Sequence, residues 1–328
     1  MITIRPHIGL SSVCGILLWG LVASCTTTVT DESGLAANAI TFQSPQTRAT
    51  ADGAFPAGSS FTVWGYRTPT GESMPIPVFD DVEVTESDGV WTYGGETRYW
   101  EKENTYDFYA LYPSTIEASS TPQNTYLTIN SHTFGTADIL MAARQNMSGN
   151  SPEVVSLTFR HLLSKLQFVV KADKASQDIV GKIHLNSAKL HGLYKEGAYS
   201  GETFSADDVT QSGTWSGAAG SIGTSDAPNS RYSGNKEVTP DGISVFDEDL
   251  LVMPYRLDDK VILELNYTIG KTTPVTKTFN LALAQIARWE AGKNYRYSIT
   301  IIDEEHILFE VPTVQPWTSA TGGIIIVE

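Results

Sequence analysis

Cys25 is the residue whose position most directly indicates a chemical modification. It follows Val22, Ala23 and Ser24, which close an apolar run with small residues. A cysteine at this place is the lipobox pattern, in which the thiol is joined to diacylglycerol and the new amino terminus is acylated. Each buried methylene contributes about 0.8 kcal/mol, so several acyl chains hold a soluble domain on a bilayer. We therefore predict lipidation at Cys25.

The residues before Cys25 have the three zones of a secretory signal peptide. Arg5 supplies the positive start, residues 8–23 are mostly apolar, and small residues precede the cut. The alternative is an N-terminal membrane helix, but the apolar run is shorter than the roughly 20 residues that span a bilayer. We predict a signal peptide over residues 1–24, then Cys25 and a flexible polar tether over residues 25–39.

Residue types suited to catalysis or metal binding lack the required spacing. No HExxH pair, Gly-x-Ser-x-Gly elbow or phosphate loop occurs, and His184 and His191 are placed on separate strands. The acidic clusters lack the register of a calcium loop and are interpreted mostly as turn caps. A pair of carboxylates for sugar hydrolysis is brought together by the fold and not by sequence spacing, so the sequence leaves this possibility open. We predict no catalytic residue, no metal and no cofactor.

Several aromatic residues and one histidine could be taken for a binding platform. We interpret Trp289, Tyr295, Tyr297 and Trp317 as core rings rather than as a sugar-binding surface. His161 lies between apolar residues, where a hydrogen-bonded structural role is more common than a role as a base. These residues therefore favour a packed body over an active site.

The charge balance excludes two classes of partner. The chain has 22 basic and 37 acidic residues and a net charge of −15, and loss of residues 1–24 removes one more positive charge. Such a surface does not attract nucleic acid or anionic lipid. It suits a soluble protein exposed at a cell surface.

The composition after the tether predicts an all-β protein. Short alternating runs rich in Thr, Val, Ile, Tyr and Phe are separated by Gly, Pro, Asn and Asp, as in β-sandwiches. We predict one domain over residues 40–152 and another over 153–328, with a seam at 144–152. The expected strands are 40–43, 60–67, 106–112, 125–130, 154–160, 163–171, 243–254, 260–269, 275–283, 295–302, 307–311 and 323–328.

Residues 196–242 differ from the rest because Gly, Ser, Thr, Asp and Asn dominate there. A stretch of this length without an apolar pattern is a set of small hairpins or an exposed functional loop. Its scattered aromatic residues, Trp215 among them, leave both a solvated insertion and a contact surface open.

Several segments together resemble the fimbrillin family, the FimA-like and Mfa-like subunits of lipoprotein-derived (type V) pili. The resemblance runs from Cys25 to the C-terminus, and its individual motifs are loose. The segments that carry it are ITF at 40–42, TRA at 47–49, FTVWGY at 61–66, YW at 99–100, YDFYALYP at 106–113, ADILMA at 137–142, FRHLLSKL at 159–166, WEAGKNYRY at 289–297 and QPW at 315–317.

The resemblance implies two tandem transthyretin-like Greek-key β-sandwiches and assembly by donor-strand exchange. In polymerising members a protease cuts after an arginine behind the first strand, which implies processing between Arg48 and Ala49. The strand then leaves, and a donor strand from another subunit fills the groove. The resemblance places that donor at the C-terminus, where four apolar residues follow two glycines: Ile324, Ile325, Ile326 and Val327.

Alternative interpretations remain for Arg48, for the C-terminal segment and for the function. Arg48 is also readable as an ordinary loop arginine, and residues 323–328 as the last strand of their own sheet. The leading hypothesis is a structural subunit or accessory or tip adhesin of fimbriae, lipid-anchored on the outer membrane, with other subunits and a surface ligand as partners. The alternatives are a surface glycan-binding lipoprotein and, third, a glycan-processing enzyme.

Overall fold

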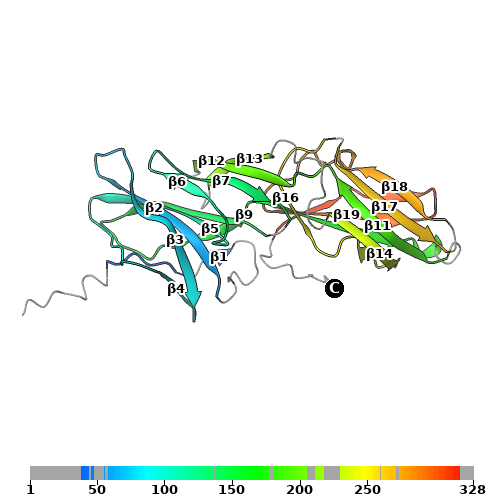
Figure 1. The fold of residues 1–328 in the computed structure, drawn as a ribbon, viewed down its shortest axis with the longest axis horizontal. Helices are drawn as coiled ribbons and strands as arrows, with labels where there is room; N and C mark the ends of the chain where they lie inside the picture. Colours follow the sequence, from blue (N-terminus) through cyan, green and yellow to red (C-terminus); the bar gives the residue numbers. More distant parts are fainter. Residues whose placement is uncertain are drawn as a thin grey trace, which may run out of the picture. The chain divides into compact units, whose positions relative to one another are not determined.

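The computed structural model describes residues 38–43, 46–47, 55, 58–135, 137–176, 181–204, 211–217, 230–258, 260–270 and 273–317. These residues form an all-β protein with several antiparallel sheets (Figure 1). They belong to one compact unit, Asn38–Glu328. Among the residues just given, no helix has the length and apolar character to cross a membrane.

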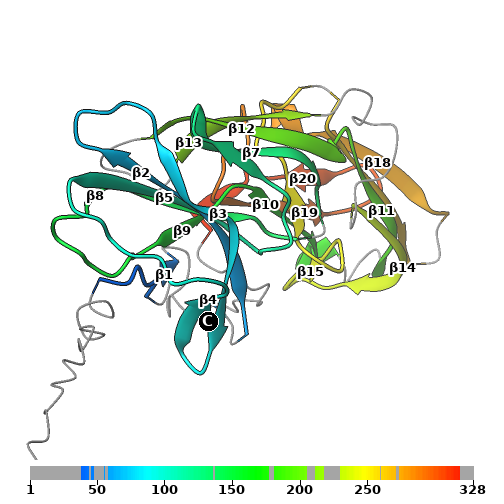
Figure 2. The same ribbon diagram turned by 60° about the vertical axis from the view of Figure 1, so that its left-hand side comes forward.

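The largest sheet has seven strands in the order β1-β9-β8-β5-β2-β3-β4. Its central strands are buried on both faces because apolar residues occupy both sides of the alternation. On β5, Tyr106 and Phe108 enter one core while Tyr109 and Leu111 enter another. Figure 2 shows β5 between β2 and β8. The strands are β1 (Gln46–Thr47), β2 (Ser60–Pro69), β3 (Ile76–Ser87), β4 (Val90–Tyr93), β5 (Asn104–Tyr112), β8 (Leu140–Ser148) and β9 (Thr158–His161).

A four-stranded sheet joins strands that lie far apart in the sequence. Its order is β13-β12-β7-β6, so the hairpin of β12 and β13 pairs with β7 from the first half of the chain (Figure 1). Across the hairpin, Tyr199 lies opposite Trp215, and both rings pack in the core that also holds Tyr109. The strands are β6 (Ser119–Thr121), β7 (Asn124–Thr133), β12 (Glu196–Phe204) and β13 (Gln211–Gly217).

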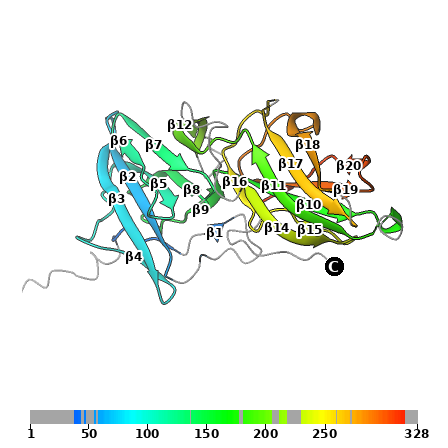
Figure 3. The same cartoon turned by 45° about the vertical axis from the view of Figure 1, so that its right-hand side comes forward.

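The second half of the chain forms two further sheets around a separate core. In one sheet, β10 and β19 are parallel over eight residue pairs, from Lys165 opposite Asn294 to Ala172 opposite Ile301. The other has the order β14-β11-β17-β18 (Figure 3). The strands are β10 (Ser164–Ala172), β15 (Ile243–Ser244), β16 (Leu250–Val252), β19 (Lys293–Ile301), β20 (Ile307–Phe309), β21 (Thr313–Pro316), β11 (Ile183–His191), β14 (Arg231–Val238), β17 (Ile262–Ile269) and β18 (Val275–Asn280).

Several details differ from the sequence predictions. Within the seam predicted at 144–152, residues up to Ser148 belong to strand β8. His184 and His191 lie on one strand, β11, and not on two. Residues 40–43 do not form a regular strand, because only Phe42 among them makes bridges, and these are isolated. The hairpin interpretation of the Gly- and Ser-rich stretch is confirmed over β12 and β13.

Candidate functional site

The first described segment of the chain closes the seven-stranded sheet. This opening segment comprises residues 38–43 and β1. β1 pairs in parallel with β9, and Phe42 bridges Trp91 in β4, which is the opposite edge strand. Phe42 also bridges Val155, just before β9. The opening segment therefore joins both edges of one sheet.

Backbone hydrogen bonds hold the opening segment in an extended conformation. The Ile40 amide donates to the Arg98 carbonyl at 2.8 Å, and the Val155 amide donates to the Thr41 carbonyl at 2.8 Å. The Tyr93 hydroxyl donates to the Ile40 carbonyl at 3.0 Å. Such main-chain pairing does not depend on the side chains, so another extended peptide can make the same bonds.

The side chains of the opening segment alternate between core and solvent. Ile40 is 0% exposed and Phe42 is 5% exposed, whereas Thr41 and Gln43 face solvent. The Phe42 ring meets four aromatic rings edge-on, with the nearest centroid, that of Phe79, at 5.5 Å. We call the cluster around Phe42 the aromatic core; its other rings are Phe55, Phe61, Phe79, Trp91, Trp100, Tyr106, Phe108 and Phe159.

Gly65 makes room for this ring packing. A Cβ at Gly65 would lie 2.9 Å from the Phe79 ring and 3.0 Å from the Phe108 ring. The first contact is shorter than real Cβ atoms make and the second is tight, so the two rings pack against β2 at these distances because the side chain is absent. Phe42 then rests against both rings.

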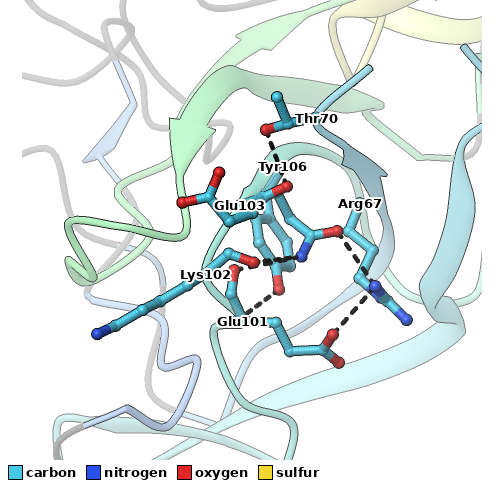
Figure 4. A network of polar contacts seen from close by, with 7 residues as sticks. Arg67, Thr70, Glu101, Lys102, Glu103 and Tyr106 are labelled. Carbon is cyan, nitrogen blue, oxygen red and sulfur yellow. Dashed lines mark hydrogen bonds and ion pairs between the residues drawn. The ribbon is translucent and has the colours of Figure 1, made fainter. Parts of the chain in front are cut away.

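A polar network fixes the loop that follows Trp100, a residue paired with the opening segment (Figure 4). The Arg67 guanidinium contacts Glu101 at 3.0 Å and donates to Asn104 Oδ1 at 3.1 Å. Asn104 Nδ2 donates to the Lys102 carbonyl at 2.8 Å, and the Glu101 amide donates to the Tyr106 hydroxyl at 2.8 Å. The loop begins after Trp100, whose amide donates to the Asn38 carbonyl at 2.8 Å. The backbone next to the partner of Asn38 is thereby held in place. We call the space that the opening segment fills, between Trp91, Arg98 and Val155, the slot.

The residues predicted to carry processing and exchange fall outside the described residues. These are Cys25, Arg48, Ala49, Ile324, Ile325, Ile326 and Val327. Arg48 is the residue after Thr47, the last residue of β1. The last described residue is Trp317, which directly follows β21.

His161 has the structural role that the sequence predicted. Its ring is 4% exposed, and Nδ1 lies 2.7 Å from an Asp138 carboxylate oxygen. The ring also stacks on Trp317, with centroids 3.8 Å apart and planes 5° apart. Trp289, Tyr295, Tyr297 and Trp317 are buried, as predicted for core rings.

The acidic clusters have two different roles. Asp303 caps a turn by accepting from the His306 amide at 2.7 Å, and its carboxylate also lies 2.9 Å from His306 Nδ1. The hydrogen bond with the His306 side chain and then the one with its amide lower the pKa of Asp303. Asp249, by contrast, pairs with the buried Lys165 ammonium at 2.6 Å and is no solvated cap. Sequence reasoning missed Lys165, because nothing in an apolar run marks which cation is buried. Among the described residues, no group of three or more His, Cys, Asp or Glu could hold a metal ion.

A sequence model of the fimbrillin-like family matches residues 47–317, which is most of the chain. The chain belongs to the fimbrillin-like family. Among curated proteins, no sequence matches this fimbrillin-like chain. The family assignment that the sequence motifs suggested is therefore confirmed by a match that spans every sheet described above.

Solved structures share the fold of this fimbrillin-like chain. A fimbrial protein from Bacteroides vulgatus is 19% identical, with a TM-score of 0.54 over 84% of this chain and 99% of that chain. A candidate cell adhesion protein from Bacteroides uniformis is 18% identical, with a TM-score of 0.50 over 86% of this chain and 99% of that chain. Similarity at this level of identity establishes the fold.

Proposed function

We propose that this chain is a structural subunit or an accessory or tip adhesin of cell-surface fimbriae, assembled by donor-strand exchange. In this proposal the body consists of two tandem transthyretin-like sandwiches, and Cys25 carries the lipid that holds the unprocessed chain on the outer membrane. Its partners are other fimbrial subunits. Family membership and the names of the structural relatives support this reading, and neither suggests a reaction to assign.

The observation that carries the proposal is that the opening segment pairs with both edges of the seven-stranded sheet and buries its side chains between them. A segment that joins both edges of a sheet leaves two rows of unpaired backbone groups when it is removed. Loss of Ile40 and Phe42 also uncovers the aromatic core. Burying about three such side chains again would contribute on the order of 5–9 kcal/mol before ordering costs. An extended, alternating, apolar strand from a second copy would meet both requirements.

Trypsin provides a direct test, because the basic residues are favourably distributed. Arg48 is the first basic residue after Arg5, and no Lys or Arg follows Arg296. Trypsin can therefore release the opening segment while it leaves the C-terminal segment intact. We expect limited digestion to convert the monomer into a ladder of oligomers that resist detergent on gels.

Arg48→Gln should abolish the ladder, and Arg296→Gln is the matched control. Arg296 is an exposed arginine on β19, away from the opening segment, so its removal should leave the ladder unchanged. Clean cleavage after Arg48 that yields only monomers would contradict the exchange mechanism.

The donor can be tested by charging one face of the C-terminal segment at a time. Ile324 and Ile326 share one face of an extended strand, and Ile325 and Val327 share the other. We expect the paired substitution to Asp on one face to abolish oligomers and the pair on the opposite face to preserve them. Equal effects of the two pairs would argue against an inserted strand, because a solvated tail has no buried face.

A further inference from the structure

A cavity of about 820 Å³ lies between residues from both halves of the chain. Its walls come from four parts of the chain: the end of β9, the hairpin of β12 and β13, residues 254–256 with 288–293, and residues 316–317. This volume is in the range of sites that hold small molecules. The described residues of the opening segment, 38–43 and β1, are not among the residues that line the cavity.

The charge of the cavity is opposite to that of the protein. Four cationic side chains line it, Arg160, Arg256, Arg288 and Lys293, against one carboxylate, Glu290. The whole chain, by contrast, has a net charge of −15. A local excess of cations in an acidic protein raises the concentration of anions at that place.

Two of the arginines are held close together by the backbone. Arg256 and Arg288 lie opposite each other in an isolated antiparallel bridge. The Leu257 amide donates to the Ala287 carbonyl at 3.0 Å, and the Trp289 amide donates to the Tyr255 carbonyl at 3.0 Å. These bonds flank the arginine pair, so it is of the non-hydrogen-bonded type, in which side chains come closest.

Like charges in such a pair are destabilising. Within the described chain, neither guanidinium has a carboxylate within ion-pair distance, and both side chains are exposed. A carboxylate bound between them would turn this repulsion into charge-assisted hydrogen bonds from two planar donors. The geometry of the pair therefore favours a bound anion.

The other walls of the cavity are aromatic. The Trp215 indole is half-buried and is oriented by a hydrogen bond from Nε1 to the Leu162 carbonyl at 3.1 Å. The Tyr255 ring is half-buried against Trp289, and its hydroxyl donates to the Gly192 carbonyl at 3.1 Å. Burial raises the pKa of Tyr255, so this hydroxyl stays protonated at neutral pH. Fixed ring faces of this kind pack on the C–H faces of a sugar ring.

We propose that this cavity binds a carboxylated saccharide, with its carboxylate between Arg256 and Arg288 and its ring against the aromatic walls. Such carboxylates occur in hexuronic acids and in sialic acids. The experiment therefore measures binding of an oligogalacturonate and of sialyllactose by calorimetry, each beside its neutral counterpart, a galactose oligomer and lactose.

We expect one of the two acidic sugars to bind at least tenfold more tightly than its neutral counterpart. The sugar that does so shows whether the cavity binds a hexuronic acid or a sialic acid. Arg256→Gln and Arg288→Gln should each weaken this binding at least tenfold, whereas Arg296→Gln should change it less than twofold. Neither variant should lower the melting temperature of the free protein, because each removes a repulsion.

The calorimetry, which also measures an acidic peptide, would overturn the proposal in any of three ways. Acidic and neutral sugars bind equally or neither binds, both arginine variants keep the original affinity, or the acidic peptide binds more tightly than either saccharide. A lower melting temperature in both variants would likewise show that the arginines have structural partners and would overturn it.

Discussion

Lys165 is a buried charge near the start of β10. It is 5% exposed, its ammonium contacts Asp249 at 2.6 Å, and it lies 5.6 Å from the centre of the Trp317 ring. Gln167 also donates to Asp249, at 3.0 Å. A buried cation of this kind depends on its carboxylate, because removal of one partner leaves the other uncompensated.

The two halves of this pair should differ when they are substituted singly. Asp249→Asn leaves the Lys165 charge buried without a counter-charge, and we expect a loss of about 3 kcal/mol in the free energy of unfolding. Lys165→Met removes the buried charge and keeps much of its volume, so its cost should be below about 1.5 kcal/mol. Urea unfolding measures both. A larger loss in Lys165→Met would mean that the ammonium is stabilising in itself.

At the scale of elements, the opening segment is short and depends on its side chains. Outside β1 it makes only isolated bridges, so Phe42 and Ile40 contribute much of what holds it. A segment of this kind can open locally at a free energy below that of global unfolding. This local weakness is what an exchange of strands requires.

Phe42→Ala tests this dependence. The Phe42 ring contacts four aromatic rings, so we expect a loss of about 3–5 kcal/mol and faster trypsin cleavage after Arg48. Thr41→Ala is the matched control, because Thr41 faces solvent and contributes its carbonyl to the pairing. Equal cleavage rates in the two variants would mean that the backbone alone holds the segment.

Sequence patterns predicted those strands whose apolar residues follow a simple period. β5 was predicted because its aromatic and apolar residues run with one interruption from Tyr106 to Tyr112, and β10 because Leu166, Phe168 and Val170 alternate along it. β3 was missed because Pro77 and the pair Asp80 and Asp81 interrupt its alternation, and Asp81 has φ 53°, which marks a local irregularity of the strand. Local disruption of this kind is invisible to a period of two.

The candidate sites were predictable to different degrees. Ile40 and Phe42 alternate, so the first strand could be placed before its partners were known. The facing of Arg256 and Arg288 could not be predicted, since it depends on the register between two irregular segments. The role of Trp215 likewise depends on a hairpin without apolar alternation, which pairs with a strand from the other half of the chain.

At the scale of the whole molecule, the net charge of −15 opposes the approach of one subunit to another. The proposed contacts are made by backbone pairing and apolar side chains, so charge affects the encounter more than the final complex. Salt shortens the range of the repulsion, from about 30 Å at 0.01 M to about 10 Å at 0.1 M.

We therefore expect trypsin-cleaved protein to oligomerise several-fold faster as sodium chloride rises from about 10 to about 200 mM. The detergent resistance of finished oligomers should not change with salt. Light scattering gives the rate, and gels give the resistance. A rate that falls with salt would point to attraction between oppositely charged patches instead.

The attachment of β21 and Trp317 decides how the body bears tension. β21 pairs antiparallel with β19, the Trp317 amide donates to the Gly292 carbonyl at 2.8 Å, and the Trp317 ring lies on His161. A pull along β21 acts at right angles to its interstrand hydrogen bonds, so they are loaded together rather than broken one after another. Because β19 is paired in turn with β10, the load passes into the middle of the sheet. A strand pulled along its length in this way resists more force than a strand pulled away from its neighbour, whose hydrogen bonds break one at a time.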